Sequence, residues 1–445
     1  MLTSFLRTKG PRLLSLAAIA TFVVACGQAF SDVPSSEAQS TAPRPTPTAT
    51  SMPGVSADEE GEFPNFMTSG WRTDFSKHSA PLREISTGGP GKDGIRPIDE
   101  PVFAQASEPP PYMRDDEPVV SLELNGEARA YPLAILIGHE IVNDTIGGVP
   151  VTINYCPLCN SAIVFDRRLG GRVLDFGTTG NLRNSDLVMW DRQTESWWQQ
   201  ITGEAIVGEL TGSRLTFIPV QLVSWGDFRD AYPDGLLLTR ETGSLRDYDR
   251  PPYDGYDLLD SRPFLFRGAI DQRLGAVERV LTLDIGGEAV AYPFSVLAEH
   301  PVVNDTVGDQ PVVVFYTGST LTPFPDSDIL GRVSGLGSEG YRREAERLLK
   351  ETPPEEFMPS RPVGSAAAYD PRVDGRHLAF AARDGLIVDE QTGSVWNILG
   401  QAVSGPLTGT TLARVVHGNH FWFAWAAFHP ETAVRTAADA DLARP

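Results

Sequence analysis

Two cysteines, Cys156 and Cys159, are the residues of this sequence best suited to chemistry. They stand in the run Tyr155-Cys-Pro-Leu-Cys-Asn-Ser-Ala-Ile-Val-Phe-Asp-Arg167, and the one other cysteine of the chain is Cys26. Two thiolates at this spacing suit a tetrahedral site for a metal ion such as Zn, Cu or Fe. The same pair could form a reversible dithiol–disulfide couple or an inert disulfide. The sequence therefore predicts a site centred on this pair and leaves three chemistries open.

Each of these chemistries has a feature against it. A disulfide that closes a four-residue loop adds only about 2 kcal/mol in the loop-entropy model. A thioredoxin-like redox site needs a helix N-terminus to stabilise the thiolate, whereas Ala162–Phe165 favour a strand. A metal knuckle at the tip of a hairpin needs further ligands. These would have to come from His139, from His417 and His420, or from a second chain.

The polar and aromatic segment 180–200 predicts a small-molecule pocket around the pair. Its Arg183, Asp186, Trp198 and Gln199 combine hydrogen-bonding capacity with aromatic surface. The same residues could equally form a structural network. The sequence contains no Ser-His-Asp context, phosphate loop, dinucleotide fingerprint or HExxH motif. No catalytic residue is therefore predicted, and whether the chain is an enzyme stays open.

An internal repeat organises the chain. Residues 119–155 and 280–316 align without a gap, and 18 of the 37 pairs are identical. A second block, 191–198, matches 389–396 in the same order. The second copy has Thr317 and Thr320 in place of the two cysteines, so the scaffold does not need thiols to fold. His139 recurs as His300, which favours a structural role for it and leaves it a secondary candidate ligand.

The residue patterns within the repeats predict strands and few helices. Residues 119–131 alternate around Asn125-Gly126, and the copy has Gly286-Gly287 there, as expected for hairpins with tight turns. Short helices are expected over 132–138 and 293–299, each with proline in its first turn. Val149–Tyr155 and Ala162–Arg167 read as paired strands, and Asn143 and Asp144 are predicted to shape the turn before Gly147.

The expected fold is therefore mainly β, a tandem duplication of one β-rich unit packed as a single body. The first repeat is expected over residues 61–265 and the second over 266–435, followed by a tail at 436–445. The segment 338–358 interrupts the pattern, and its stretch Glu339–Glu351 predicts an inserted surface helix.

The N-terminus predicts export and a lipid anchor. Residues 1–25 hold three basic residues, no acid and an apolar run that is too short to span a bilayer comfortably. The run ends in Val23-Val-Ala-Cys26, which resembles a bacterial lipobox, so Cys26 is the expected lipidation site. Residues 26–60, with the lipidated cysteine at their start, are rich in Ser, Thr and Pro and predict a disordered stalk.

The charge of the chain bears on its partners. The net charge is −21, and removal of the three basic residues of the signal peptide leaves −24. Such an acidic body repels nucleic acid, and the membrane is expected to be reached only through the anchor. The expected location is the extracytoplasmic face of a bacterial membrane. The small-molecule or protein partner is left open.

Several motifs resemble one family. The run Asn143-Asp-Thr-Ile-Gly-Gly-Val-Pro-Val-Thr-Ile-Asn-Tyr-Cys-Pro-Leu-Cys-Asn-Ser-Ala-Ile-Val-Phe-Asp-Arg167 looks like the bacterial Domain of Unknown Function 3179 family. The likeness continues at Trp71–Lys77, Thr194–Gln199 and Phe421–Trp425, and covers about Phe63 to Arg435. It implies one unit that contains both repeats and makes the Cys-Pro-Leu-Cys element a family hallmark. It brings no catalytic residues.

The sequence thus favours an envelope lipoprotein that uses its thiol pair for metal or cofactor binding or for redox chemistry. The alternative is a non-catalytic envelope scaffold, or a small-ligand-binding protein, in which Cys156 and Cys159 form a structural disulfide.

Overall fold

The computed structural model describes residues 65–253, 255–258, 261–324 and 361–442. The signal peptide, the lipidation site Cys26, the stalk and the helix expected over Glu339–Glu351 lie outside these residues. Within them, no helix is long and apolar enough to cross a membrane. The described part of the chain is rich in strands and has few, short helices, as the sequence predicted. The helices are α1 (Asn65–Thr68), η2 (Leu82–Glu84), α2 (Leu133–His139), η3 (Pro157–Cys159), α3 (Trp225–Ala231), α4 (Phe294–Glu299), α7 (Trp422–Phe428) and α8 (Ala437–Leu442).

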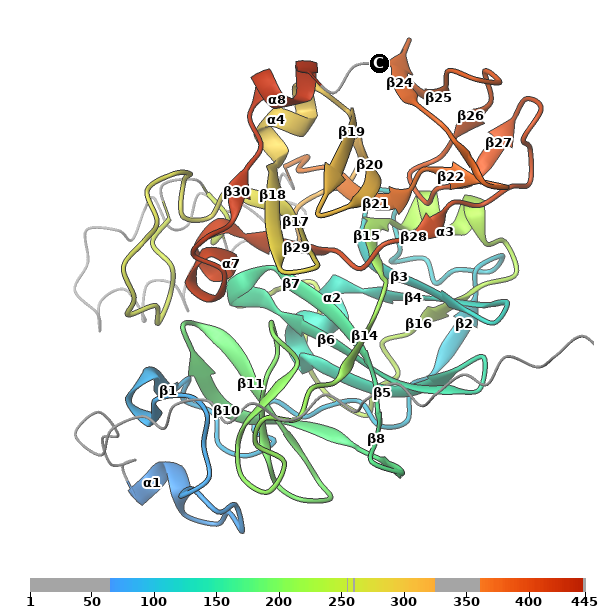
Figure 1. The fold of residues 1–445 in the computed structure, drawn as a ribbon. Coiled ribbons are helices and arrows are strands. Elements are labelled where there is room, and N and C mark those ends of the chain that lie inside the picture. Colours follow the sequence, from blue (N-terminus) through green and yellow to red (C-terminus); the bar gives the residue numbers. More distant parts are fainter. Residues whose placement is uncertain (1–64, 254, 259–260, 325–360, 443–445) are drawn as a thin grey trace, which may run out of the picture. The chain divides into compact units, whose positions relative to one another are not determined.

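The first part of the chain, residues 85–238, forms three sheets (Figure 1). One has the strand order β15-β3-β4-β16-β2, one the order β14-β7-β6-β5 and one the order β1-β10-β11-β12-β13. A separate two-stranded ribbon pairs β8 with β9. The strands are β1 (Ile85–Thr87), β2 (Phe103–Gln105), β3 (Pro118–Leu124), β4 (Glu127–Pro132), β5 (Ile141–Ile146), β6 (Val149–Cys156), β7 (Ser161–Asp166), β8 (Arg168–Leu169), β9 (Arg172–Val173), β10 (Phe176–Arg183), β11 (Asp186–Asp191), β12 (Trp197–Gln199), β13 (Glu204–Val207), β14 (Thr216–Ile218), β15 (Gln221–Ser224) and β16 (Leu236–Leu238).

Residues 279–434 repeat this order of pairings. Their sheets are β29-β17-β18-β30, β19-β20-β21-β28 and β24-β25-β26-β27, with the ribbon β22-β23. The first part differs by the extra edge strands β1 and β2. That the two parts arose by duplication stays a prediction from the sequence. The strands are β17 (Arg279–Ile285), β18 (Glu288–Pro293), β19 (Val302–Val307), β20 (Gln310–Thr317), β21 (Ser365–Asp370), β22 (Arg372–Val373), β23 (Arg376–His377), β24 (Phe380–Arg383), β25 (Leu386–Asp389), β26 (Val395–Trp396), β27 (Ala402–Ser404), β28 (Ala413–Arg414), β29 (Gly418–Phe421) and β30 (Ala433–Val434).

Turn chemistry explains the first hairpin of each part. Asn125 and Gly126 both have positive φ, 52° and 84°, between β3 and β4. Gly286 and Gly287 adopt 64° and 86° between β17 and β18. A two-residue turn of this kind has the twist that antiparallel strands need, which is why the sequence signal was sufficient here.

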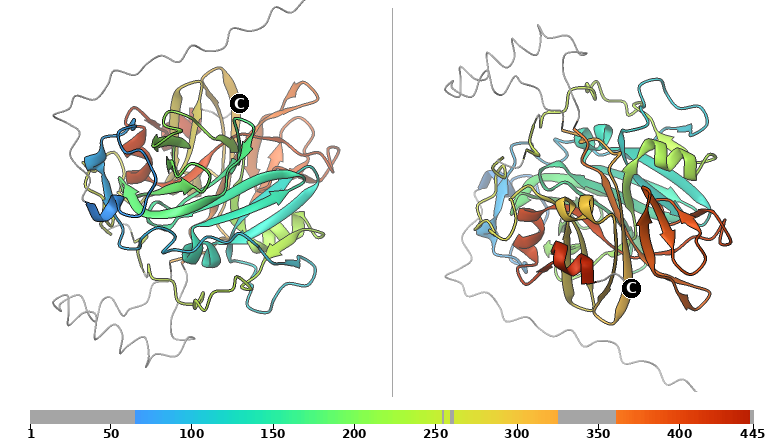
Figure 2. Two further views of the ribbon diagram at one scale, coloured as in Figure 1. Left: turned by 90° about the horizontal axis from the view of Figure 1, so that it is seen from below. Right: turned by 90° about the horizontal axis from the view of Figure 1, so that it is seen from above.

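The two parts share their buried cores. One hydrophobic cluster joins Val119 and Trp225 of the first part to Phe315 and Tyr369 of the second. Another joins the strands around Phe165 to residues of β17, β29 and α7. In Figures 1 and 2 the strands coloured cyan to green accordingly lie against those coloured gold to red. Each fully buried large apolar side chain contributes about 1.5–3 kcal/mol, so these shared clusters stabilise the contact between the two parts.

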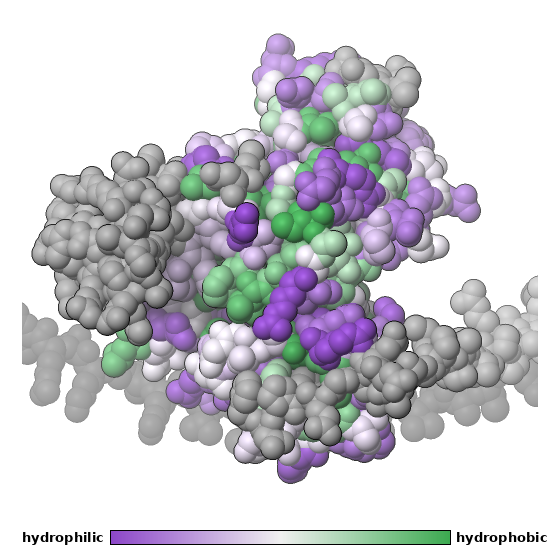
Figure 3. All heavy atoms as spheres, turned by 90° about the vertical axis from the view of Figure 1, so that its left-hand side faces the viewer, coloured by the Kyte–Doolittle hydropathy of each residue, from purple (hydrophilic) through white to green (hydrophobic). Residues whose placement is uncertain are grey.

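Hydrophobic side chains also reach the surface. Figure 3 shows a face on which they gather in a central band, with hydrophilic residues on either side. Among the described residues, the exposed large hydrophobics include Leu245, Phe264 and Ile270. All three follow β16 in the sequence, in the connection between the two parts.

Candidate metal site

The two thiols lie at the tip of the hairpin β6–β7, where the sequence predicted them. Strand β6 ends at Cys156, the short turn η3 follows with Pro157 in its first position, and β7 begins at Ser161. Asn160 closes the turn in the left-handed conformation, with φ of 49°, and accepts a hydrogen bond from the Tyr155 hydroxyl at 3.1 Å. Both cysteines are buried free thiols. The turn therefore projects two sulfur atoms from a rigid hairpin.

Asp186 joins the thiols from another sheet. It is the first residue of β11, after the tight turn at Asn184 and Ser185. The carbonyl oxygen of Ser185 accepts contacts from Cys159 Sγ at 3.4 Å and Cys156 Sγ at 3.7 Å. The two sulfur atoms and an Asp186 carboxylate oxygen all lie within 4.8 Å of one another. Among the residues that the structure describes, this is the one group of three or more His, Cys, Asp or Glu side chains that could hold a metal ion.

Neighbouring groups fix the carboxylate but leave one of its oxygens open. Gln199 Nε2 donates to Asp186 Oδ2 at 2.6 Å, and the backbone N–H of Ile201 donates to the same oxygen at 3.0 Å. Asp186 Oδ1 and Gln199 Oε1 are buried and have no hydrogen-bond partner in the described part of the chain. Buried polar atoms are almost always paired. The open Oδ1 is therefore available to a ligand.

A second glutamine locks the two sheets together at the site. Gln200 Oε1 accepts from Ser161 Oγ at 3.0 Å, and its Nε2 donates to the Ser161 carbonyl at 3.0 Å. Its backbone N–H donates to the Leu187 carbonyl at 3.1 Å. The start of β7, which follows the thiols, is thus held against the start of β11, which carries the carboxylate. Such outer partners orient metal ligands in proteins.

The electrostatics describe a buried acidic cluster with little compensating charge. Burial raises the pKa of Asp186 to about 7. Burial also raises the pKa of Cys156, and the charges of Asp186 and Glu140 add to the effect. Burial and the neighbouring Cys156 and Asp186 raise the pKa of Cys159 well above its usual range. A thiol with a raised pKa is a poor nucleophile, so the geometry does not favour fast thiol–disulfide exchange.

A covering segment, here the described residues of 240–267, lies over the thiols. Tyr256 donates its hydroxyl to the Leu158 carbonyl at 3.1 Å and accepts the Phe264 N–H at 3.1 Å. Asp257 of this segment is buried and pairs with Arg279 at 2.7 Å and Thr322 at 2.6 Å in the second part of the chain. The second part thereby anchors the segment that closes the site.

The site belongs to the first part of the chain only. The second part has Thr317 and Thr320 at the cysteine positions. Its hairpin β24–β25, in which Phe380 pairs with Asp389, is shorter than β10–β11, in which Phe176 pairs with Asp191. Asp186 sits at the tip of the longer hairpin, and the shorter hairpin of the second part has no corresponding position.

The structure brings some of the predicted site residues together and separates others. Asp186 and Gln199 lie at the thiols. Trp198 donates its ring N–H to Asp191 at 2.9 Å, and Trp396 makes the same bond to Asp389 at 3.1 Å in the second part, as expected for a structural contact. The remaining residue of the predicted pocket, Arg183, forms an ion pair with Glu84 at 2.7 Å.

The predicted histidine ligands lie outside the three-residue group. Both ring nitrogens of His139 are engaged, with the Arg96 carbonyl at 2.7 Å and the Tyr248 hydroxyl at 2.8 Å. His417 and His420 belong to the second part, and burial lowers the pKa of His417 to about 4 and that of His420 to about 3.

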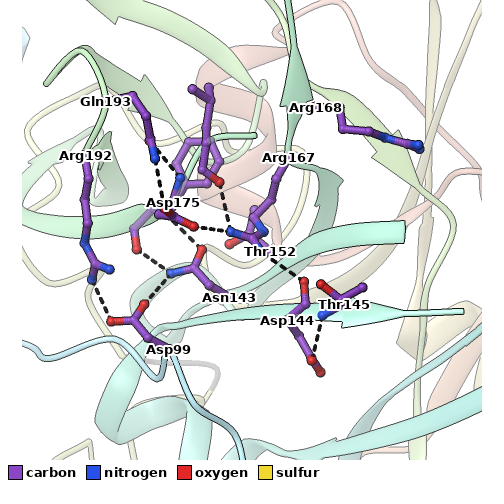
Figure 4. Close-up of polar contacts among 12 residues, drawn as sticks. Asp99, Asn143, Asp144, Thr145, Thr152, Arg167, Arg168, Asp175, Arg192 and Gln193 are labelled. Carbon is purple, nitrogen blue, oxygen red and sulfur yellow. Dashed lines mark hydrogen bonds and ion pairs between the residues drawn. The ribbon is translucent and has the colours of Figure 1, made fainter. Parts of the chain in front are cut away.

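The turn prediction for Asn143 and Asp144 was wrong. Asn143 donates to Asp99 and to the Phe176 carbonyl, both at 2.8 Å, and accepts the Phe176 N–H at 3.0 Å (Figure 4). Asp144 instead accepts from Arg129 and from the hydroxyl of Tyr131 at 2.6 Å. Asn143 therefore clamps the start of β10, the hairpin that carries Asp186 at its tip.

Sequence reasoning missed two residues near the thiols. Gln200 directly follows the predicted Gln199, and nothing in the sequence separates their roles. Glu140 is a buried carboxylate in the first part, whereas the repeat alignment places Pro301 opposite it. The difference between Glu140 and Pro301 at one position of two otherwise similar repeats was the sequence signal that could have identified Glu140.

The fold and the site together define a β-rich protein with one buried cluster of two thiols and a carboxylate. Residues 92–432 match the model of a family described as a protein of unknown function, DUF3179. The chain belongs to this family, as the motifs in its sequence suggested. No curated protein and no solved structure matched the chain.

Proposed function

We propose that Cys156, Cys159 and Asp186 bind one thiophilic divalent metal ion. The observation that carries the proposal is the convergence of three buried ligand atoms from two sheets, with Asp186 Oδ1 open. Ligands at about 2.3 Å from one tetrahedral ion lie roughly 3.8 Å apart, so the observed limit of 4.8 Å requires only small side-chain movements. The ion would also balance the acidic charge of the cluster.

Zn²⁺ suits this donor set best. Zinc is borderline in softness and accepts thiolate and carboxylate ligands together. Cu⁺ prefers thiolate and thioether donors, and protein iron–sulfur clusters are usually held by four cysteines. Three protein ligands with an open fourth position are also typical of catalytic rather than structural zinc.

The location proposed for this metal site is the extracytoplasmic face of a bacterial membrane. A lipid on Cys26 would anchor the chain, and a stalk over residues 26–60 would hold the body away from the bilayer. The sequence features of residues 1–60 support this part of the proposal, together with the acidic body, which disfavours nucleic acid as a partner.

The test is metal analysis of the purified body, residues 27–445, prepared without chelator and with a thiol reductant. Wild-type protein should carry one equivalent of metal, and Asp186→Asn should carry much less. Asp191→Asn is the matched control, because Asp191 is also buried but binds only Trp198 and Thr194 through its side chain. Equal metal content in the wild type and Asp186→Asn would remove Asp186 from the site.

A second candidate function follows from the closeness of the thiols. An exported protein meets oxidants, and the pair could form a disulfide that is either redox-active or structural. This candidate predicts a metal-free chain that is about 2 Da lighter than the reduced form. The reduction potential of this disulfide would then distinguish a redox-active pair from a structural one.

A further inference from the structure

The turn between β10 and β11 directs a backbone carbonyl at the two thiols. Asn184 and Ser185 form this turn, and both have positive φ, 52° and 68°. The Ser185 carbonyl oxygen lies 3.4 Å from Cys159 Sγ and 3.7 Å from Cys156 Sγ. Ser185 also directly precedes Asp186, whose carboxylate belongs to the three-residue group. One short turn therefore presents two oxygen atoms to the two sulfur atoms.

The conformation of Ser185 is held from outside the turn. The hairpin β24–β25 of the second part turns through Asp384 and Gly385, and the second of these is a glycine, which adopts positive φ at no steric cost. Ser185 occupies such a conformation without being glycine, is buried, and donates its hydroxyl to the Phe264 carbonyl in the covering segment. A strained non-glycine residue persists only when the surrounding structure holds it. The covering segment therefore fixes the direction of the Ser185 carbonyl.

The two sulfur–oxygen distances fit one tetrahedral site. With about 2.3 Å from zinc to sulfur and about 2.1 Å from zinc to oxygen, a sulfur and an oxygen ligand lie roughly 3.6 Å apart. The Ser185 oxygen stands at 3.4 Å and 3.7 Å from the two sulfur atoms, on either side of this value. The carbonyl oxygen can therefore serve as a ligand without a change in the backbone.

Metal binding would take away the protons that this carbonyl receives from the thiols. Cysteine binds metal as the thiolate and releases its proton. The Ser185 oxygen would then face two negative sulfur atoms, and no other group of the described residues donates a hydrogen bond to it. A buried acceptor without a partner is unfavourable. A cation in contact with the oxygen would restore a favourable partner.

We propose that the Ser185 carbonyl oxygen is the fourth ligand of the metal ion, so that four protein ligands close the site. This inference rests on the proposed metal site. The carbonyl fills the position that the three side chains leave open, and a backbone carbonyl also acts as a weak ligand beside cysteine in copper sites. The ion would connect the turn after β6 to the tip of the hairpin β10–β11, as structural zinc connects elements, and would bind no water.

The burial of the ligands agrees with a closed site. Cys156, Cys159, Ser185 and Asp186 are each at most 2% exposed. Tyr256 of the covering segment donates its hydroxyl to the carbonyl of Leu158, between the two cysteines. Catalytic zinc keeps one position open to water or substrate, whereas structural zinc does not. A site whose ligands are all buried suits an ion that is retained to hold the fold.

Co²⁺-substituted protein, residues 27–445, tests whether a position at the ion is open. The visible spectrum should be that of four-coordinate cobalt and should not change on addition of azide. The electron paramagnetic resonance lines should not broaden in water enriched in ¹⁷O, because no water is bound. A spectrum altered by azide, or broadened lines, would overturn the closed site. A wild type that takes up neither Co²⁺ nor Zn²⁺ would instead overturn the metal site itself.

The Ser185 carbonyl itself can be followed by NMR. Protein labelled with ¹³C-carbonyl serine and ¹⁵N-aspartate gives a correlation only for Ser-Asp pairs, and residues 27–445 hold three, at 31–32, 185–186 and 327–328. The 185–186 signal is the one that disappears in Ser185→Gly, a variant that keeps the carbonyl and the positive φ and should keep one equivalent of metal. Zn²⁺ should shift this signal and leave the other two in place. An unshifted 185–186 signal would overturn the proposal, as would loss of metal from Ser185→Gly, which would make the hydroxyl the ligand.

Discussion

Replacement of Asp186 by asparagine should have opposite effects on stability without and with metal. In the metal-free protein, the Asp186 carboxylate is buried beside two thiols and Glu140, and no cation contacts it among the described residues. The asparagine side chain has nearly the same size and carries no charge. With metal present, the same substitution removes a ligand. If Asp186 is present because it binds metal, its carboxylate should therefore lower the stability of the metal-free protein.

The magnitude follows from the pKa of Asp186. Burial raises it from 3.8 to about 7, and a difference of this size corresponds to on the order of 4 kcal/mol. Because the folded-state pKa is raised, the penalty is absent below pH 4, where the carboxyl is neutral in both states. It grows as the pH rises and is complete above pH 7. Metal-free Asp186→Asn should thus gain up to about 4 kcal/mol at pH 8 and little at pH 4.

The assay is thermal unfolding of wild type and Asp186→Asn under reducing conditions. With chelator at pH 8, the variant should melt several degrees higher. With Zn²⁺ at about 1,000 times the wild-type Kd, wild type should gain about 4 kcal/mol from binding and the variant much less. The order of the two melting temperatures should then reverse. A variant that melts lower than wild type in chelator, or that gains as much from Zn²⁺, would refute this role of Asp186.

Three further predictions concern the surroundings. A Cys156→Ser, Cys159→Ser double variant should lose bound metal yet melt within a few degrees of metal-free wild type, whereas a structural disulfide predicts a lower melting temperature under oxidising conditions. Asp257→Asn should destabilise the fold by about 3–5 kcal/mol in urea unfolding, because it leaves the buried Arg279 charge without its partner. Burial in the wild type tends to raise the pKa of Asp257, but the Arg279 charge and the hydrogen bond from Thr322 outweigh it, so this pKa is lowered. The stability that the ionised Asp257 contributes is therefore present above pH 4 and should be lost below it. A protein that keeps this stability in acid unfolding would contradict the pairing. Asn143→Ala should cost about 2–3 kcal/mol, because it removes two hydrogen bonds to Phe176 at the start of β10 and one to Asp99, and it should weaken metal binding if that hairpin positions Asp186. Unchanged metal affinity would show that the hairpin tip is held independently.

Local sequence patterns were sufficient for the elements that local forces determine. The hairpin turn at Asn125-Gly126 needs positive φ at both residues, and few other residue pairs supply it. The strands on either side of the thiols were predictable because β6 and β7 are apolar and β-branched over short runs. The short helices that follow proline were predicted for the same local reason.

The site was only partly predictable because it depends on contacts between distant elements. Asp186 and Arg183 face each other at one hairpin tip, yet Asp186 reaches the thiols and Arg183 reaches Glu84. Paired residues of antiparallel strands share a face of the sheet, so the different partners of these two side chains depend on distant elements, which composition does not reveal. The positive φ of Glu140 has no local sequence signal either, since the backbone there is held by Leu136 and Tyr155.

Native mass spectrometry of residues 27–445, exported to an oxidising compartment and purified without chelator, tests the central claim most directly. The expected result is a chain that carries one metal ion, loses it on acidification, and has the mass of the reduced thiols once the metal is gone. A metal-free chain that is lighter by about 2 Da, owing to a disulfide between Cys156 and Cys159, would contradict the proposed metal site.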